Sequence, residues 1–129
     1  MIRVSIIITI FVFFLNACNE AHTIDVHVGD EIVFDFSLIS IAYPERRLVV
    51  KDLLVMQKNC KRYCEAWRIE GNQYAEVVTS ISYGSTPKGM KGTVKKSLTK
   101  GDYYVAGRIW LKDELGINGP IDFYSDFTV

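Results

Sequence analysis

Histidine is nearly absent from this 129-residue chain, which contains only His22 and His27. A Ser-His or Cys-His pair therefore has no histidine after residue 27 to act as its base. The Gly-x-Ser-x-Gly motif of a nucleophile elbow is missing, and Gly84 to Gly89 lacks the spacing of a phosphate-binding loop. A blue-copper centre, which needs two histidines and a cysteine, is excluded by the same shortage. We therefore expect no catalytic residues, no cofactor and no enzymatic activity.

Acidic residues are missing from Val77 to Gly101, although Lys and Arg (15) balance Asp and Glu (15) over the whole chain. This overall balance gives no electrostatic case for binding nucleic acid. Two interpretations of the basic stretch stay open. Lysines can protect an edge strand from pairing with other chains, or they can form a docking patch for an acidic protein or for anionic envelope groups. The lysines concerned are Lys88, Lys91, Lys95, Lys96 and Lys100.

The first 17 residues have the order of a secretory signal. One charge, Arg3, precedes twelve apolar or small residues from Val4 to Leu15. Twelve helical residues span about 18 Å, against a hydrocarbon core of roughly 30 Å, so an uncleaved membrane span is the weaker interpretation. We expect residues 1–17 to be a signal peptide and the protein to be exported.

The sequence Leu15-Asn-Ala-Cys18 resembles the lipobox of bacterial lipoproteins. The resemblance implies cleavage before Cys18, acylation of Cys18 and attachment to a membrane through lipid. Asn19 is not the aspartate that marks inner-membrane retention in that family, which implies an outer-membrane location facing the periplasm. We expect residues 18–23 to be a lipidated tether and residues 24–129 to be one domain.

Cys60 and Cys64 are the remaining cysteines. In an oxidising compartment paired thiols become disulfides, so we favour a bond that staples a tight turn. A helical interpretation also exists, because Cys60, Tyr63, Cys64 and Trp67 follow an i, i+3, i+4, i+7 stripe. Copper or another metal held by the two cysteines and one histidine is a further alternative. Of the two histidines, His22 is expected in the tether and His27 on a solvent-facing strand.

Apolar residues alternate with a period of two through most of the domain, which predicts strands with one buried face. The clearest are 31–36, 103–111 and 121–129, where Tyr103, Val105, Ile109 and Leu111 share the expected inner face. Further strands are expected at 24–28, 47–56, 74–83 and 92–98, separated by turn signals that include Asn118-Gly-Pro120. Seven or eight short strands predict an all-β antiparallel sandwich.

Two short motifs refine this fold class. Val28-Gly-Asp-Glu-Ile-Val-Phe34 resembles the entry to the second strand of bacterial immunoglobulin-like and cupredoxin-like sandwiches. Leu98-Thr-Lys-Gly-Asp-Tyr103 resembles the tyrosine corner that opens the penultimate strand of such domains. The resemblances imply an immunoglobulin-like topology, with the Tyr103 hydroxyl bonded back to the corner. Trp67 is expected in the core.

Tyr104, Arg108 and Trp110 alternate with the expected inner residues of strand 103–111, so they are predicted to form an exposed row. Tyr, Arg and Trp are enriched at binding hot spots. The leading hypothesis is a non-catalytic envelope lipoprotein that binds an unidentified protein, in immunity, assembly or exclusion. Inhibition of a periplasmic enzyme is an alternative, because Ser97-Leu-Thr-Lys-Gly101 resembles a segment of lipoprotein lysozyme inhibitors, although their cysteine pattern is missing. Metal handling through Cys60 and Cys64 is a third hypothesis.

Overall fold

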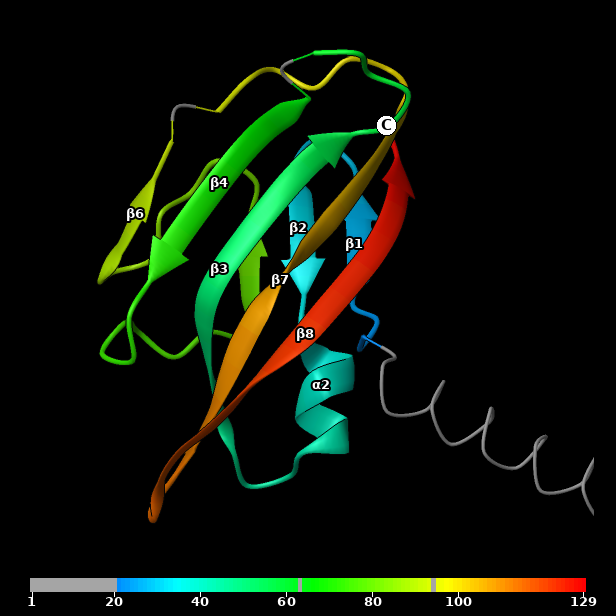
Figure 1. Ribbon diagram of the computed structural model, residues 1–129. Coiled ribbons are helices and arrows are strands. Elements are labelled where there is room, and N and C mark those ends of the chain that lie inside the picture. Colours follow the sequence, from blue (N-terminus) through cyan, green and yellow to red (C-terminus); the bar gives the residue numbers. More distant parts are fainter. Residues whose placement is uncertain (1–20, 63, 94) are drawn as a thin grey trace, which may run out of the picture.

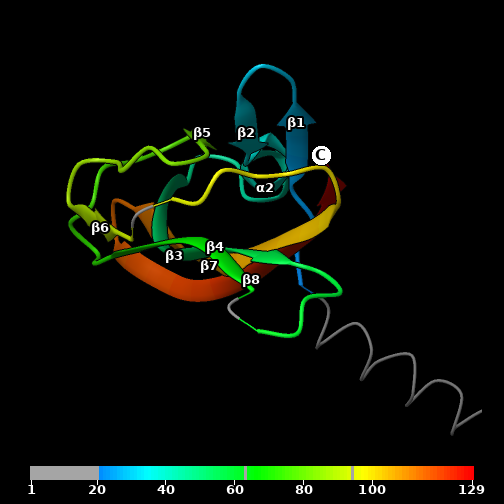
Figure 2. The ribbon, with the colours of Figure 1, turned by 90° about the horizontal axis from the view of Figure 1, so that it is seen from above.

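Two antiparallel sheets packed face to face make up the domain (Figures 1 and 2). The computed structural model describes residues 21–62, 64–93 and 95–129. The smaller sheet has the order β1-β2-β5 and contains β1 (Asp25–Val28), β2 (Ile32–Asp35) and β5 (Ser80–Ser82). The larger sheet has the order β6-β4-β3-β7-β8 and contains β3 (Arg47–Gln57), β4 (Glu65–Gly71), β6 (Met90–Gly92), β7 (Asp102–Asp113) and β8 (Gly116–Thr128). A short helix, α2 (Ser37–Ala42), follows β2.

The strand order confirms the predicted fold class. In an immunoglobulin-like sandwich the first two strands share a sheet with strand E, and strands C, F and G form the other sheet. Here β1, β2 and β5 correspond to the first set, and β3, β7 and β8 to the second, with β4 added beside β3. The short strand β6 extends the larger sheet on that side.

The core lies between the sheets and follows the predicted alternation. On β7, Tyr103, Val105, Ile109 and Leu111 are buried, while Tyr104, Ala106 and Arg108 between them are half-buried or exposed. Trp67 on β4 is fully buried, as expected, and its ring meets the edge of the Tyr83 ring. Further buried apolar residues on or next to β2, α2, β3 and β8 include Phe34, Phe36, Ile39, Leu48, Val50, Leu53, Phe123 and Phe127.

The start of β7 forms the predicted tyrosine corner. The Tyr103 hydroxyl donates to the Thr99 carbonyl oxygen at 2.9 Å and accepts from the Thr99 amide at 3.2 Å. Gly101 exchanges backbone hydrogen bonds with Val129, so the corner is also tied to the end of the chain. The segment that resembles lysozyme inhibitors therefore lies in this corner, where its hydrogen bonds are internal to the domain.

The outer edge of β8 is covered by the first described residues. His22 pairs with Phe123 as a parallel bridge, in which the His22 amide donates to Asp122 and the Tyr124 amide donates to His22. The buried Ser125 hydroxyl accepts from the Ile24 amide at 2.9 Å and donates to the Ile24 carbonyl at 2.5 Å. We call these contacts of residues 22–24 the N-terminal clamp. Among the described residues, the first of these contacts is made by His22.

Three sequence-based boundaries were wrong around β4. Residues 65–71 form a strand that was not predicted, because the helical spacing of Cys60, Cys64 and Trp67 competes with the alternation of buried Trp67 and Ile69 with outward Arg68 and Glu70. The expected strand 74–83 is reduced to Ser80–Ser82, since the preceding residues cross from one sheet to the other. The expected strand 92–98 does not continue beyond Gly92. The Thr93 amide donates to the Arg68 carbonyl and the Lys96 amide donates to the Ala66 carbonyl, and these two hydrogen bonds are not spaced as in a regular antiparallel ladder.

The last hairpin also differs from the prediction. The turn lies at residues 113–116, where the Asp113 carboxylate accepts from the Leu115 and Gly116 amides. Asn118-Gly-Pro120 falls inside β8, and a register shift opposite Trp110 accommodates it. A proline is tolerated there because β8 is an edge strand. The helix α2, also unpredicted, ends just before Pro44.

The tyrosine corner gives a direct test of the strand phase. Tyr103→Phe should lower the free energy of unfolding by about 1–3 kcal/mol, because the Thr99 backbone groups lose a buried partner. Tyr104→Phe is the matched control, and it should leave stability nearly unchanged because Tyr104 contacts Tyr124 through its ring. Urea unfolding of both variants measures this, and equal costs would contradict the assigned inner face.

Candidate protein-binding face

The side of the larger sheet that points away from the smaller sheet carries the candidate site (Figure 1). None of the described helices or strands covers the central strands on this side (Figure 2). The residues here alternate along β3, β4, β7 and β8 with the buried core residues. We call this surface the open face and define it by Leu54, Met56, Arg68, Tyr104, Ala106, Arg108 and Tyr124.

The centre of the open face is apolar and aromatic. Cross-strand register places Met56 opposite Tyr104 and Leu54 opposite Ala106. Ala106 is in turn opposite Tyr124 on β8. The Tyr104 and Tyr124 rings stack with centroids 5.3 Å apart and an interplanar angle of 24°. Cross-strand neighbours of this kind stabilise one another's positions, so the aromatic surface is arranged before any partner arrives.

Ion pairs fix the charged side chains around this centre. Arg108 donates to the Asp52 carboxylate through Nη2 at 2.6 Å and Nε at 3.1 Å. Arg68 donates through Nε to Glu65 at 2.8 Å. A bidentate or clustered guanidinium is held in a defined direction, which lowers the entropy lost on binding. Both arginines therefore present oriented guanidinium groups beside the apolar centre.

A second charge cluster borders the aromatic pair. The Asp126 carboxylate accepts from Lys58 Nζ at 2.5 Å and from the Tyr124 hydroxyl at 2.7 Å. These hydrogen bonds, first that from Lys58, lower the pKa of Asp126 below its ordinary value. The same carboxylate raises the pKa of Tyr124. The Tyr124 ring is thus held over the sheet with its hydroxyl neutral and partly engaged.

A shallow hollow lies in the middle of the open face. Its volume is about 180 Å³, and its walls include Leu54, Arg68, Ala106 and Arg108. Pockets for small molecules usually measure about 300–1,000 Å³. The hollow is therefore better suited to one protruding side chain of a partner than to a separate ligand.

Gly107, which lines the hollow, allows β3 and β7 to approach closely. β3 has a register shift between Val50 and Asp52, and this irregularity brings the backbone of Asp52 against β7. A Cβ on Gly107 would lie 2.1 Å from the Asp52 carbonyl oxygen and 2.7 Å from the Phe123 ring. Only glycine fits this approach, so the close packing of β3 against β7 depends on this residue.

The structure divides the predicted row on β7. Arg108 is exposed, whereas Tyr104 and Trp110 are both half-buried: Tyr104 lies on the open face against Tyr124, and Trp110 packs against the core. The register shift in β3 moves Lys51 over the Trp110 ring, with Nζ 5.6 Å from the centroid, and the cross-strand neighbour Val49 is fully buried. Trp110 therefore has a packing role that alternation alone could not reveal.

Besides Ala106, whose position follows from the alternation in β7, four open-face residues were not predicted from the sequence. Leu54 and Met56 belong to the nearly continuous apolar run 48–56, which reads as buried on both faces. Arg68 lies on the unpredicted strand β4, and Tyr124 alternates with core residues of β8. The alternation in β8 was visible in the sequence and could have identified Tyr124, whereas the others require the strand order.

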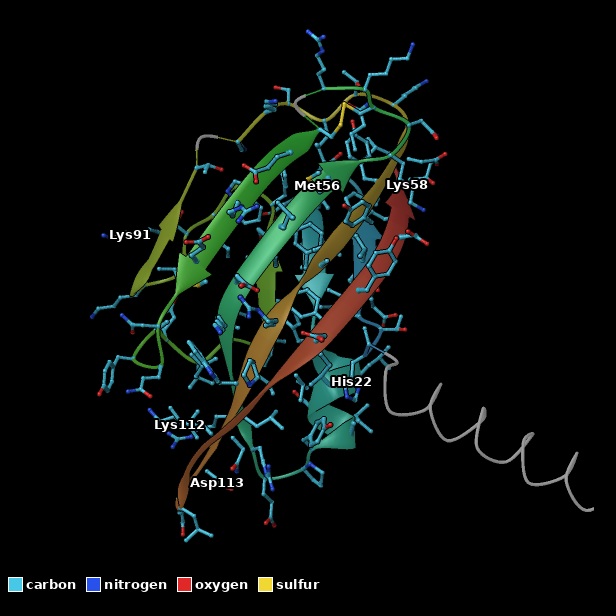
Figure 3. All side chains as sticks on the ribbon, in the orientation of Figure 1. His22, Met56, Lys58, Lys91, Lys112 and Asp113 are labelled. Atoms are coloured by element: carbon cyan, nitrogen blue, oxygen red, sulfur yellow. A yellow bond between two sulfur atoms is a disulfide. The ribbon has the colours of Figure 1, made fainter. Side chains whose placement is uncertain are left out.

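The lysines do not gather on the open face. Lys91 on β6 is opposite Glu70, at the edge of the larger sheet (Figure 3). Lys95 lies over the Tyr83 ring at 5.9 Å, and Lys96 accepts through its carbonyl from the Tyr83 hydroxyl at 2.5 Å. Burial raises the pKa of Tyr83 to about 12, so this hydroxyl remains a donor. Lys88 donates its amide to the Glu76 carboxylate.

Cys60 and Cys64 form a disulfide, as predicted, with their Cα atoms 5.5 Å apart. The bond staples the turn after β3, where Gln57 donates its amide to the Cys64 carbonyl (Figure 3). Sulfurs joined in this way are not thiolates and do not ligate metal. His27 interacts with Asp35 and His22 with Tyr43, both apart from the disulfide. Within the described part of the chain, no group of three or more His, Cys, Asp or Glu residues could hold a metal ion.

The predicted lipidation site Cys18 and the predicted signal peptide 1–17 lie outside the described residues. In the part of the chain that the structure describes, no helix is long and apolar enough to cross a membrane. No protein-family model matches the chain, and neither a curated protein nor a solved structure matches it. The functional proposal therefore rests on the sequence and on the geometry above.

Substitution of Gly107 tests the close approach of β3 to β7. Gly107→Ala should lower the free energy of unfolding by about 1–3 kcal/mol, because a backbone oxygen and a core ring must both shift. Gly29→Ala is the matched control, since its Cβ would meet its nearest neighbour at 4.0 Å, and it should change stability by less than about 0.5 kcal/mol. Thermal or urea unfolding measures both, and similar stability of the two variants would contradict the close approach.

Proposed function

We propose that this chain is a non-catalytic, lipid-anchored protein of the bacterial cell envelope that binds another protein through the open face. The observation that carries the proposal is the pre-arranged surface of stacked Tyr104 and Tyr124 beside the oriented Arg108 and Arg68. Tyrosine and arginine dominate binding hot spots, and surfaces held in place before binding lose less entropy. Immunity, assembly and exclusion all require such a binding surface.

The charge of the open face favours a protein over a polyanion. Its basic side chains are already paired with carboxylates from the same sheet, including Asp52, Glu65 and Asp126. A nucleic acid or a polyanionic glycan would have to compete with these carboxylates for each cation. A protein can instead cover the apolar centre and leave the ion pairs intact at the rim of the interface.

The N-terminal sequence supports the location. The apolar run 4–15 and the lipobox-like Leu15-Asn-Ala-Cys18 place an acylated cysteine at the start of the mature chain. The disulfide between Cys60 and Cys64 fits an oxidising compartment outside the cytoplasm. The proposal therefore places the binding domain at the periplasmic surface of the outer membrane.

Replacement of Cys18 tests the anchor. The parent protein should fractionate with membranes and accumulate as a larger precursor when signal peptidase II is inhibited. Cys18→Ser should show neither behaviour, because the lipidated sulfur is lost. Equal membrane association and equal processing of the parent and the variant would remove the lipoprotein interpretation.

Site-specific cross-linking in cells tests the binding face. A photo-reactive phenylalanine analogue at Tyr104 or Tyr124 should cross-link one and the same protein. The control is the analogue at Tyr74, which is 80% exposed but lies outside the open face. Equal cross-linking from Tyr74, or no adduct from either open-face position, would contradict the proposal.

A second variant shows whether the cross-linked protein uses the hollow. Ala106→Arg fills the hollow with a long side chain and should reduce the cross-link from Tyr124 about tenfold or more, as expected for a hot spot. Thr79→Arg adds the same charge at an exposed site outside the open face and should leave the cross-link unchanged. Loss of the adduct in both variants would indicate a nonspecific charge effect.

A further inference from the structure

The helix α2 exposes an apolar surface that the fold does not use. Ile39 points into the core, whereas Leu38 is 43% exposed and Ile41 is 75% exposed. Residues three positions apart on a helix are neighbours, so these two side chains form one exposed ridge. No charged residue occurs from Phe36 to Pro44. A solvent-facing helix surface normally carries polar residues, so we expect this apolar ridge to contact a partner.

The N-terminal clamp places the start of the described chain directly beside α2. The His22 and Tyr43 rings meet edge to face with centroids 5.4 Å apart, and the Tyr43 hydroxyl lies 3.1 Å from His22 Nε2. Tyr43 is the C-cap of α2. Whatever precedes His22 in the chain therefore emerges next to this helix, at the same end of the sandwich (Figures 1 and 3).

The chain between the clamp and Cys18 is short. Cys18 precedes His22 by four residues, and four fully extended residues span at most about 14 Å. An acyl chain on Cys18 enters the bilayer at the level of this residue. The membrane surface therefore lies within about 14 Å of His22, a distance only slightly greater than the roughly 10–12 Å width of an α-helix with its side chains.

We infer that the end of the sandwich that carries α2 rests on the lipid bilayer, with Leu38 and Ile41 in the interfacial region. This inference depends on the anchor in the proposed function. Leu115, which is 97% exposed at the tip of the β7–β8 hairpin, lies at the same end. The pair between Arg46 and Asp113 at 3.6 Å links that hairpin to the loop after α2. Apolar side chains from two elements thus face the same side.

The proposed membrane contact is apolar rather than electrostatic. The charged residues around the apolar end balance, with three basic (Arg46, Arg47, Lys112) and three acidic (Glu45, Asp113, Glu114). Attraction to anionic headgroups needs an excess of basic residues. The contact should therefore resist high salt, unlike the binding of a polybasic peptide.

Fluorescence quenching measures the depth of the ridge. The full acylated protein is reconstituted into vesicles of phosphatidylethanolamine and phosphatidylglycerol, and an NBD fluorophore is attached to Leu38→Cys or Ile41→Cys. Val28→Cys is the matched control, because Val28 is an apolar residue of similar exposure (45%) at the opposite end of the sandwich. The acylated Cys18 and the Cys60–Cys64 disulfide leave the introduced thiol as the reactive one.

Lipids with a nitroxide on the acyl chain should quench the labels at 38 and 41 several-fold more than the label at 28, in low and in high salt. Equal quenching at all three positions in protein that floats with the vesicles would overturn the membrane contact and leave the anchor intact. Protein that does not float at all would instead overturn the anchor. Strong quenching that disappears in high salt would replace the apolar contact with an electrostatic one.

Discussion

The N-terminal clamp is the constraint on which the arrangement of the molecule depends. Ser125 is a buried polar residue on β8, and its hydroxyl bonds both backbone groups of Ile24. Together with the His22 bridge, it covers the outer edge of the longest strand of the larger sheet. An uncovered edge of this length would invite pairing with other chains. The clamp also carries the chain from the larger sheet to β1 of the smaller sheet, so it joins the two layers.

The clamp links the fold to the proposed function. Because the chain is fixed from His22 onward, the proposed lipid anchor on Cys18 would have only a short tether, which would restrict how far the domain can turn above the membrane. With α2 toward the bilayer, the strands of the larger sheet rise away from it and the disulfide turn lies at the distal end (Figure 3). The open face then lies on the side of the domain, where a neighbouring envelope protein can reach Tyr104 and Tyr124 without displacing lipid.

Much of this fold could be predicted from local patterns. Period-two alternation placed the buried residues of β2, β7 and β8 correctly, and the tyrosine corner was visible as Leu98 to Tyr103. The disulfide followed from the spacing of Cys60 and Cys64 and from the expected compartment. These features depend on residues that are near one another in sequence, which is why one sequence was sufficient.

The features that could not be predicted depend on residues that are distant in the sequence. The strand β4 and the irregular end of β6 are determined by pairing across the sheet, and the shift in β3 that covers Trp110 with Lys51 has no sequence signature. The open face combines residues of four strands; alternation predicts its members on β7 and β8, whereas Leu54, Met56 and Arg68 require the strand order. The helix α2 was missed because its six residues are too few for a helical periodicity to appear.

Hydrogen exchange at two amides tests the clamp most directly. The Ile24 amide donates to Ser125 Oγ and the Tyr124 amide donates to the His22 carbonyl. In the full chain bound to vesicles, both amides should be protected to a degree similar to the central amides of β7, and Ser125→Ala should accelerate exchange at Ile24. Exchange of both amides in the parent protein as fast as in the exposed turn at Gly29 to Glu31 would contradict the clamp, and the fixed orientation above the membrane with it.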